Sequence, residues 1–516
     1  MGEEGKNKVI VKNTLLLYFR QLVVLLIGLY TSRIVLNVLG VTDYGIYNVV
    51  GGVIVLFGFI TNALGNATSR FIAFATGKKD EENSKDTFGT LLTIYCAIAI
   101  IILFLGESLG IWFVYNYLVI PPERFTAAVW VYHFSVLAAV MNVLYVPYNS
   151  LIIAYEKMSA FAYISVMDAS LKLFVVYLLI ISPFDKLIIY AGLLFLIQVI
   201  DMTIYMVYCK RKFVEPSVKL VYKPRLFKKI LVFSGWTLNG NLAVVCYSQG
   251  LNILLNMFFG PTVNAARGIA TQVQSITLNF VSGFQTAVNP QITKSYAQND
   301  NKRMYILLHA SCRFSYYLMY LFALPFLLKS ICILKLWLKI VPDYTVPFLS
   351  LILVFTLLRT ITNPINIAVQ ATGDIKRYQL IEGTMGLMIL PMAFVALKFF
   401  HTGPVSVFWV LVLMEFITVF VRIYVGVLHI NDSLSYFFKS VIVPIAKISI
   451  IAGFLPWLVS IITPDSLLGV FAVLFSMIVW TLPTMFILGL SKREQSLILT
   501  KITNWGFFNK KNEEKI

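Results

Sequence analysis

The residues of this sequence that are best suited to chemistry are charged side chains set inside long apolar stretches. Nine Lys and Arg residues and five Asp and Glu residues lie in such stretches. A charge at the centre of a membrane span costs at least ~2.5–3.5 kcal/mol on insertion scales, so each one needs a partner or a function. The four histidines and five cysteines show no metal-ligand or redox spacing. We therefore expect binding of a charged substrate, with no catalytic residue, no metal and no cofactor.

Arg359 is the embedded cation that its position explains least well. It lies about 14 residues from the outer end and about 11 from the inner end of a predicted span at 345–370. A helix rises about 1.5 Å per residue, which places Arg359 near the membrane midplane, beyond easy snorkelling. Its counterpart in an internal repeat is Asn142. The two sequence halves would then present different polar groups at one depth, and both residues are predicted to bind substrate.

The other embedded cations are less clear. Arg20 and Arg33 are 13 residues apart on one predicted helix, a rotation of about 220°, so they do not share a face. Each lies within about 10 Å of its own membrane surface, which leaves open whether it faces a lumen. Arg70, Arg422 and Lys447 lie within about 10 Å of the cytoplasmic surface and can snorkel, and we favour snorkelling for the last two.

Two groups of embedded charges suit ion coupling. Asp168 and Lys172 are four residues apart on a predicted helix, and they most simply neutralise each other. Glu415 lies in the middle of a predicted span, with Arg422 two turns away on the same face. Glu415 is either a proton site or the partner of this arginine, and the sequence does not separate the two. Asp168, Lys172 and Glu415 are therefore the candidates for ion coupling.

Polar side chains also follow helical spacing in three predicted spans. These stripes comprise Asn48, Gly52, Asn62, Asn66 and Arg70; Asn241, Ser248, Asn252 and Asn256; and Arg267, Thr271, Gln274, Ser275, Ser282, Gln285 and Asn289. Hydrogen bonding between helices would explain such residues, but the length of the stripes favours a wetted cavity. We predict Arg267, Asn252, Gln274 and Gln285 as part of its lining. The embedded charges sum to a surplus of four cations, which suits an anionic headgroup bearing sugars.

The composition dictates the elements that position these residues. Of 516 residues, 59% are hydrophobic and 13% are charged, which is typical of an integral membrane protein. Hydropathy predicts an all-α protein with fourteen spans. They lie at 14–38, 44–74, 88–113, 126–153, 160–182, 187–208, 231–258, 262–293, 305–328, 345–370, 379–399, 404–428, 441–462 and 467–490.

The charges between the spans predict the orientation. With a cytoplasmic N-terminus, 27 of the 42 Lys and Arg residues lie in inner segments and six lie in outer loops. The positive-inside rule then places both termini in the cytoplasm. Most of the formal charge of +18 therefore reflects topology, and no nucleic-acid partner is expected.

An internal repeat predicts the domain organisation. Pro147-x-Asn149 and Pro364-x-Asn366 are offset by 217 residues, and LNVLGVTDYGIY around Gly40 matches LNMFFGPTVNAA around Gly260 at about 220. A parallel repeat of six spans is a transporter signature. We predict an N-lobe at 1–209, a basic linker at 210–230, a C-lobe at 231–428, two further helices at 429–490 and a cytoplasmic tail at 491–516. The linker suits attraction to anionic headgroups, with direct contact to the substrate as the alternative.

The motif Leu39-Gly40-Val41-Thr42-Asp43-Tyr44-Gly45-Ile46-Tyr47, with Ser69-Arg70-Phe71-Ile72-Ala73 and the loop Gly77-Lys78-Lys79-Asp80, resembles a known family. It is similar to the polysaccharide-transporter branch, which includes O-antigen flippases, of the multidrug/oligosaccharidyl-lipid/polysaccharide flippase superfamily. The resemblance implies a MATE-like fold of two lobes with a cationic central cavity. It also implies transfer of undecaprenyl-diphosphate-linked oligosaccharide to the outer leaflet of the bacterial cytoplasmic membrane. A polysaccharide polymerase and a chain-length regulator are the implied protein partners, beside membrane lipids.

The resemblance also bears on individual residues. The relative that flips the peptidoglycan lipid precursor uses arginines of its first, second and eighth spans, and Arg20 or Arg33, Arg70 and Arg267 occupy those spans here. Multidrug antiporters of the superfamily often carry an acid in the first span, whereas residues 14–38 contain none. This absence weakens the interpretation as a drug exporter. A multidrug or small-molecule cation antiporter is thus kept only as the alternative function. A multispan glycan ligase or polymerase is a further one, although the longest outer loop, about 329–344, contains no histidine.

Overall fold

The computed structural model describes most of the chain. The described residues are 3–55, 64–65, 68, 71–72, 81–155, 157–217, 220–372, 374–492 and 494–496. Every regular element within these ranges is helical. Eleven helices among them are long and apolar enough to cross a membrane. The prediction of an all-α membrane protein is thus confirmed.

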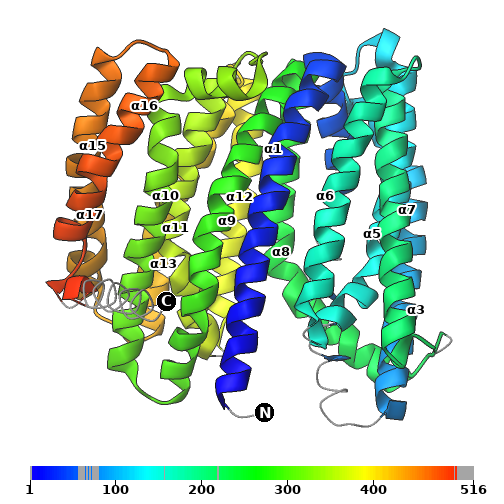
Figure 1. Cartoon of the computed structure of the whole chain (residues 1–516), viewed down its shortest axis with the longest axis horizontal. Coiled ribbons are helices and arrows are strands. Elements are labelled where there is room, and N and C mark those ends of the chain that lie inside the picture. Colours follow the sequence, from blue (N-terminus) through cyan, green and yellow to red (C-terminus); the bar gives the residue numbers. More distant parts are fainter. Residues whose placement is uncertain are drawn as a thin grey trace, which may run out of the picture. The chain divides into compact units, whose positions relative to one another are not determined.

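The helices follow the predicted spans in order (Figure 1). Those of the first half are α1 (Glu3–Val55), α3 (Glu81–Leu105), α4 (Ile111–Tyr117), α5 (Phe125–Ala154), α6 (Met158–Ile181) and α7 (Lys186–Lys212). Those of the second half are α8 (Pro224–Phe259), α9 (Pro261–Ala297), α10 (Asn301–Leu338), α11 (Thr345–Thr372), α12 (Lys376–Phe399) and α13 (Val405–His429). The chain then forms α14 (Leu434–Phe437), α15 (Val443–Ile462), α16 (Leu467–Ser476) and α17 (Leu482–Gly489).

Five short elements complete this order. Single π-helical turns join α3 to α4 at Gly106–Gly110, α14 to α15 at Phe438–Ile442, and α16 to α17 at Met477–Thr481. Each pair therefore continues as one membrane-crossing helix. Two 3-10 turns lie at Pro122–Arg124 and Glu215–Ser217.

Two glycines mark the repeat in the backbone. Gly40 interrupts α1 with φ 76° and ψ 172°, and Gly260 ends α8 with φ 79° and ψ −177°. This region is open essentially to glycine alone, because a Cβ would clash with the backbone. The same sharp turn thus recurs at equivalent positions of the two predicted repeats. We call the end of the bundle that carries these two turns the glycine end.

The chain divides into two compact units. Unit 1 comprises residues 1–268, 337–345 and 383–407, and unit 2 comprises 269–336, 346–382 and 408–516. Unit 1 thus combines the first half of the sequence with α8, the start of α9, the last residues of α10, the first residue of α11, most of α12 and the start of α13. The predicted lobes follow the repeat instead, and that division stays a prediction.

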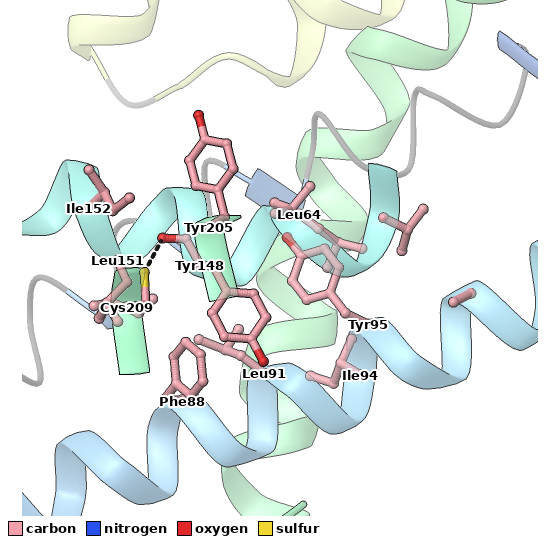
Figure 2. Packing of buried hydrophobic residues seen from close by; sticks show 14 of the residues in the cluster. Leu64, Phe88, Leu91, Ile94, Tyr95, Tyr148, Leu151, Ile152, Tyr205 and Cys209 are labelled. Carbon is pink, nitrogen blue, oxygen red and sulfur yellow. Dashed lines mark hydrogen bonds between the residues drawn. The ribbon is translucent and has the colours of Figure 1, made fainter. Parts of the chain in front are cut away.

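The core of unit 1 is formed where α3, α5 and α7 pack together. Phe88, Tyr95, Tyr148 and Tyr205 are buried there among aliphatic side chains (Figure 2). The rings of Phe88 and Tyr148 meet edge to face, with centroids 5.5 Å apart. Close packing of such large rings adds van der Waals attraction between these helices.

Three side chains fix the first-half helices at the glycine end. Arg124 lies between two carboxylates, with its Nη2 2.6 Å from Asp43 and its Nη1 2.6 Å from Asp185. Asp185 also caps α7, because it accepts hydrogen bonds from the amides of Leu187 and Ile188. Burial acts to raise the pKa of Asp185, but the bonds from Arg124 and from these amides outweigh it, so the pKa lies below its ordinary value.

The C-terminal helices are attached to α10 within unit 2 by polar contacts along its length. His309 bonds to Asp432 at 2.7 Å, and the hydroxyls of Tyr316 and Ser449 lie 2.6 Å apart. Near the other end of α10, Lys329 reaches Asp465 at 2.9 Å. Hydrogen bonds of this kind hold helices together where the hydrophobic effect does not.

Candidate substrate site

The exposed positions of α9 are all polar. Among the described side chains of this helix they are Thr262, Ser275, Asn279, Ser282, Gln291 and Thr293. The exposed positions of α13 are aromatic or aliphatic, as expected of a surface that faces lipid. Exposed polar side chains at membrane depth require water or a polar ligand. The exposed face of α9 therefore fits a wetted site, as the sequence predicts.

The middle of this face is a short stripe. Ser275, Asn279 and Ser282 are spaced by four and three residues and so lie on one side of α9. The hydroxyls of Ser275 and Ser282 donate to backbone carbonyls one turn earlier, at 2.9 and 3.0 Å. Their oxygens can still accept a bond from a ligand. Asn279 is not among the predicted lining residues, although its helical spacing from Ser275 indicates the same face.

Two predicted lining residues of α9 contact neighbouring helices of unit 2. Gln274 donates to the hydroxyl of Thr356 on α11 at 2.8 Å, and Gln285 donates to Ser315 on α10 at 3.0 Å. Both amides thus make the interhelical bonds that the sequence offered as the alternative. They set the rotation of α9, and with it the direction of the neighbouring Ser275 stripe.

Arg359 and Asn142 lie on the helices that the repeat predicts. Arg359 is partly buried on α11, with its guanidinium carbon 5.8 Å from the centre of the Phe355 ring. Asn142 is an exposed residue in the middle of α5. An exposed amide at that depth is again polar surface where lipid would favour an apolar residue.

The other predicted cations differ in their contacts. Arg20 donates to Ser165 of α6 at 3.2 Å and lies 4.6 Å from the centre of the Phe161 ring. Arg33 is partly buried on α1 and makes no hydrogen bond or ion pair within the described part of the chain. Arg267 donates to the carbonyl of Ser248. Arg70 lies outside the described residues.

Asn252 lies in a helix contact of unit 1. It is 4% exposed, its Nδ2 donates to the carbonyl of Asn48 at 3.1 Å, and its oxygens accept from Asn264 at 2.6 and 2.8 Å. All of these hydrogen-bond partners of Asn252 belong to the protein itself. The amide thus joins α8 to α1 and α9, which is the alternative that the sequence left open for this stripe.

The first ion-coupling candidates form a pair, as the spacing indicates. Lys172 bonds to Asp168 at 2.8 Å. The carboxyl group of Asp201, on α7, lies against that of Asp168. The Oδ1 atom of each of these two aspartates is buried and has no hydrogen-bond partner among the described atoms. Two carboxylates with spare oxygens can hold a proton or a small cation. The sequence counts Asp201 among the embedded acids but did not indicate its contact with Asp168, because no spacing links it to α6.

Glu415 belongs to a second charged group, inside unit 2. Arg422 contacts Glu415 at 2.5 Å and Glu382 of α12 at 3.0 Å. The side chains of Arg422 and Glu415 are 6% and 3% exposed. Arg422 is thus buried in an ion-pair network, and our expectation that it snorkels is wrong. A guanidinium presents several donors, so it can bridge two carboxylates within the protein. Lys447, in contrast, is exposed.

Long apolar helices with polar groups exposed at membrane depth define a multi-pass membrane protein. Solved structures of membrane transporters share this fold. An inward-facing multidrug resistance MATE family transporter of the MOP superfamily has a TM-score of 0.63 at 15% identity over 82% of this chain and 95% of its own. The outward-facing conformation of such a transporter gives 0.59 at 15% identity over 81% and 96%. A MOP superfamily transporter from Pyrococcus furiosus gives 0.61 at 14% identity over 81% and 96%. The predicted MATE-like fold is confirmed.

The chain belongs to the polysaccharide biosynthesis protein family, whose sequence profile matches residues 10–296. A second profile, MatE, matches residues 238–395. No curated protein matches the sequence. The predicted family is thus confirmed, and the protein is a MOP superfamily transporter rather than an enzyme.

Proposed function

We propose that the protein is a flippase for an undecaprenyl-diphosphate-linked oligosaccharide. The repeat unit of an O-antigen, capsule or exopolysaccharide would move from the inner to the outer leaflet of the bacterial cytoplasmic membrane by alternating access. One observation carries the proposal: among the described side chains of α9, every exposed one is polar, which suits a glycan better than an apolar drug. Membership of the polysaccharide biosynthesis family supports the same substrate class.

The orientation is part of the proposal. The excess of Lys and Arg in the inner segments supports a cytoplasmic position for both termini. The glycine end then faces the outside of the cell. The prenyl chain stays in lipid while the diphosphate and the sugars pass through the protein.

We assign the diphosphate to cations and the sugars to amides and hydroxyls. Arginine suits phosphate, because its planar guanidinium donates two bonds at once. The candidates are Arg20, Arg33, Arg70, Arg267 and Arg359. Asn142 remains a candidate for the sugar hydroxyls, joined by Ser275, Asn279 and Ser282 of the exposed stripe. Asn252, Gln274 and Gln285 would have to give up their bonds within the protein to bind sugar. Asp168 with Lys172, and Glu415, remain the candidates for ion coupling.

A multidrug or small-molecule cation antiporter is the second candidate. The MatE match at residues 238–395 favours it. Such an antiporter would carry out dye efflux that depends on an acid, either Asp168 or Glu415. Dye efflux without any movement of lipid-linked glycan would establish this function instead.

A leaflet-resolved assay tests the proposal. Liposomes would carry a fluorescent undecaprenyl-diphosphate oligosaccharide, with or without the purified protein, and a membrane-impermeant quencher would report the accessible fraction. We expect the protein to make the inner-leaflet pool accessible, and Arg359→Ala to abolish this at equal reconstitution. Lys447→Ala, which changes an exposed cation, is the matched control. An accessible fraction equal to that of empty liposomes would overturn the proposal.

A further inference from the structure

The strongest unexplained contact in unit 1 joins α8 to the segment between α4 and α5. The side-chain oxygen of Asn256 accepts the amide of Val119 at 2.9 Å, and its Nδ2 donates to the carbonyl of Val119 at 3.2 Å. Asn256 is 0% exposed. Leu118, just before Val119, has an extended backbone that ends α4. The side-chain amide of Asn256 therefore pairs with the backbone N–H and C=O of Val119, as the backbone of a neighbouring β-strand would.

This contact joins the two halves of the sequence at the glycine end. Val119 follows α4 of the first half, while Asn256 lies in the last turn of α8, the first long helix of the second half. Asn256 also lies one turn before Gly260, whose amide donates to the Asn256 carbonyl at 2.8 Å. The two side-chain bonds are thus placed directly beside a sharp turn that only glycine adopts.

Two further contacts close the same seam between the halves. Asn252, one turn earlier on α8, donates to the Asn48 carbonyl at 3.1 Å. A Cβ added at Gly45 would lie 1.9 Å from the carbonyl oxygen of Pro261, so the two backbones are in close contact. A buried amide that loses such bonds is strongly penalised until water replaces them. Opening of the seam therefore requires water to reach these polar groups.

We propose that Asn256 is the gate residue of the outer side. Its two bonds to Val119 hold the halves together at the glycine end while the substrate binds from the cytoplasm, and they break and re-form once in each transport cycle. This inference rests on the orientation and alternating access of the proposed function. It goes beyond that function by naming a residue that controls whether the outer side is open and that does not contact the substrate.

A cysteine accessibility experiment tests the gate without any glycan. The reporter is Val263→Cys, a buried position of α9 beside the seam, in a chain whose five native cysteines are replaced. A membrane-impermeant maleimide is added from outside to intact cells. We expect Asn256→Ala to raise the labelling rate about tenfold, the change expected for the loss of about one net hydrogen bond. Asn116→Ala, which removes an exposed amide bonded within its own helix, should leave the rate unchanged.

A second variant separates a gate from a merely structural residue. A protonated aspartic acid both donates and accepts, as an amide does, whereas an ionised one only accepts. Asn256→Asp should therefore label fast at alkaline pH and return to the parent rate as the pH falls. Rates are compared with those of the parent at each pH, which cancels the titration of Asp43 and Asp185. A rate in Asn256→Asp equal to that of the parent at every pH, or raised without pH dependence, would overturn the gate.

The two proposals can fail separately. Labelling reports opening of the outer side, while the leaflet assay reports movement of glycan. Gated labelling without glycan movement would reject the glycan substrate and keep the gate. Glycan movement together with a labelling rate that is unchanged by substitution of Asn256 would reject the gate and keep the glycan substrate.

Discussion

Asn48 and Gly268 occupy equivalent positions of the two repeats and lie against each other. They are 220 residues apart, the offset of the two sharp glycine turns, and a Cβ added at Gly268 would lie 3.0 Å from Cγ of Asn48. Residues related by a twofold axis can touch only where that axis passes between them. The second part of α1 and the start of α9 therefore cross at the axis of the repeat. Small residues allow this approach, as in other membrane helix pairs.

We expect Gly45→Ala to destabilise this crossing strongly. The new Cβ would meet the backbone of Pro261, which cannot move aside as a flexible side chain can. The cost should be about 3 kcal/mol or more. Gly51→Ala on the same helix, where a Cβ meets nothing within 4 Å, is the control. Thermal unfolding in detergent should separate the two variants, and equal midpoints would contradict the close approach.

We expect the polar stripe of α9 to be needed for transport and not for folding. Asn279→Leu and Ser282→Leu should preserve expression, because both positions are exposed, and should lower glycan export at least tenfold. Leu413→Asn on the exposed face of α13 is the reciprocal control, since it places an amide on an apolar surface. Surface glycan and membrane abundance are measured together. Normal export by both α9 variants would remove the stripe from the site.

Arg359 should act through its charge and its geometry. Arg359→Ala should abolish surface glycan and accumulate the lipid-linked repeat on the inner leaflet. Arg359→Lys should restore only part of the activity, because lysine cannot donate two parallel bonds to a phosphate. Extraction of lipid-linked oligosaccharide from cells with equal amounts of each variant gives the measurement. Full activity of Arg359→Ala would end its assignment to the diphosphate.

The ion-pair network of Arg422 should be essential for stability as a unit. Arg422→Leu leaves Glu415 and Glu382 without their cation, which should cost about 3–5 kcal/mol. Neutralising the carboxylates in the same chain, with Glu415→Gln and Glu382→Gln, should recover most of this loss. The amount of folded protein after detergent extraction reports both steps. A triple variant as unstable as Arg422→Leu would show that the arginine acts by packing alone.

The cap and ion pair of Asp185 should resist moderate acid. Its pKa is lowered in the folded protein, so its stabilisation is complete above the ordinary pKa of 3.8 and is lost as the pH falls below that value. Asp185→Asn should therefore lower the thermal midpoint by the same amount at pH 7 and at pH 5, for a cost of about 1 kcal/mol. A difference that already vanishes at pH 5 would contradict the lowered pKa.

The sequence by itself determined the class of protein, the order of the spans and the position of the repeat. Long apolar runs admit only membrane helices, because lipid satisfies no backbone hydrogen bond. Gly40 and Gly260 stand out at one offset because the turn that they make excludes other residues. Asp168 and Lys172 could be paired in advance, because residues four apart on a helix are neighbours.

Only the tertiary structure decided what each helix face meets. Helical spacing groups Asn252 with Asn256, and Ser275 with Ser282, but it does not distinguish a buried contact from an exposed surface. The structure buries the first pair against α1 and the segment at Val119 and exposes the second. Arg422 with Glu382, and Asp168 with Asp201, come from different helices. Their encounter depends on how those helices pack, which no local pattern records.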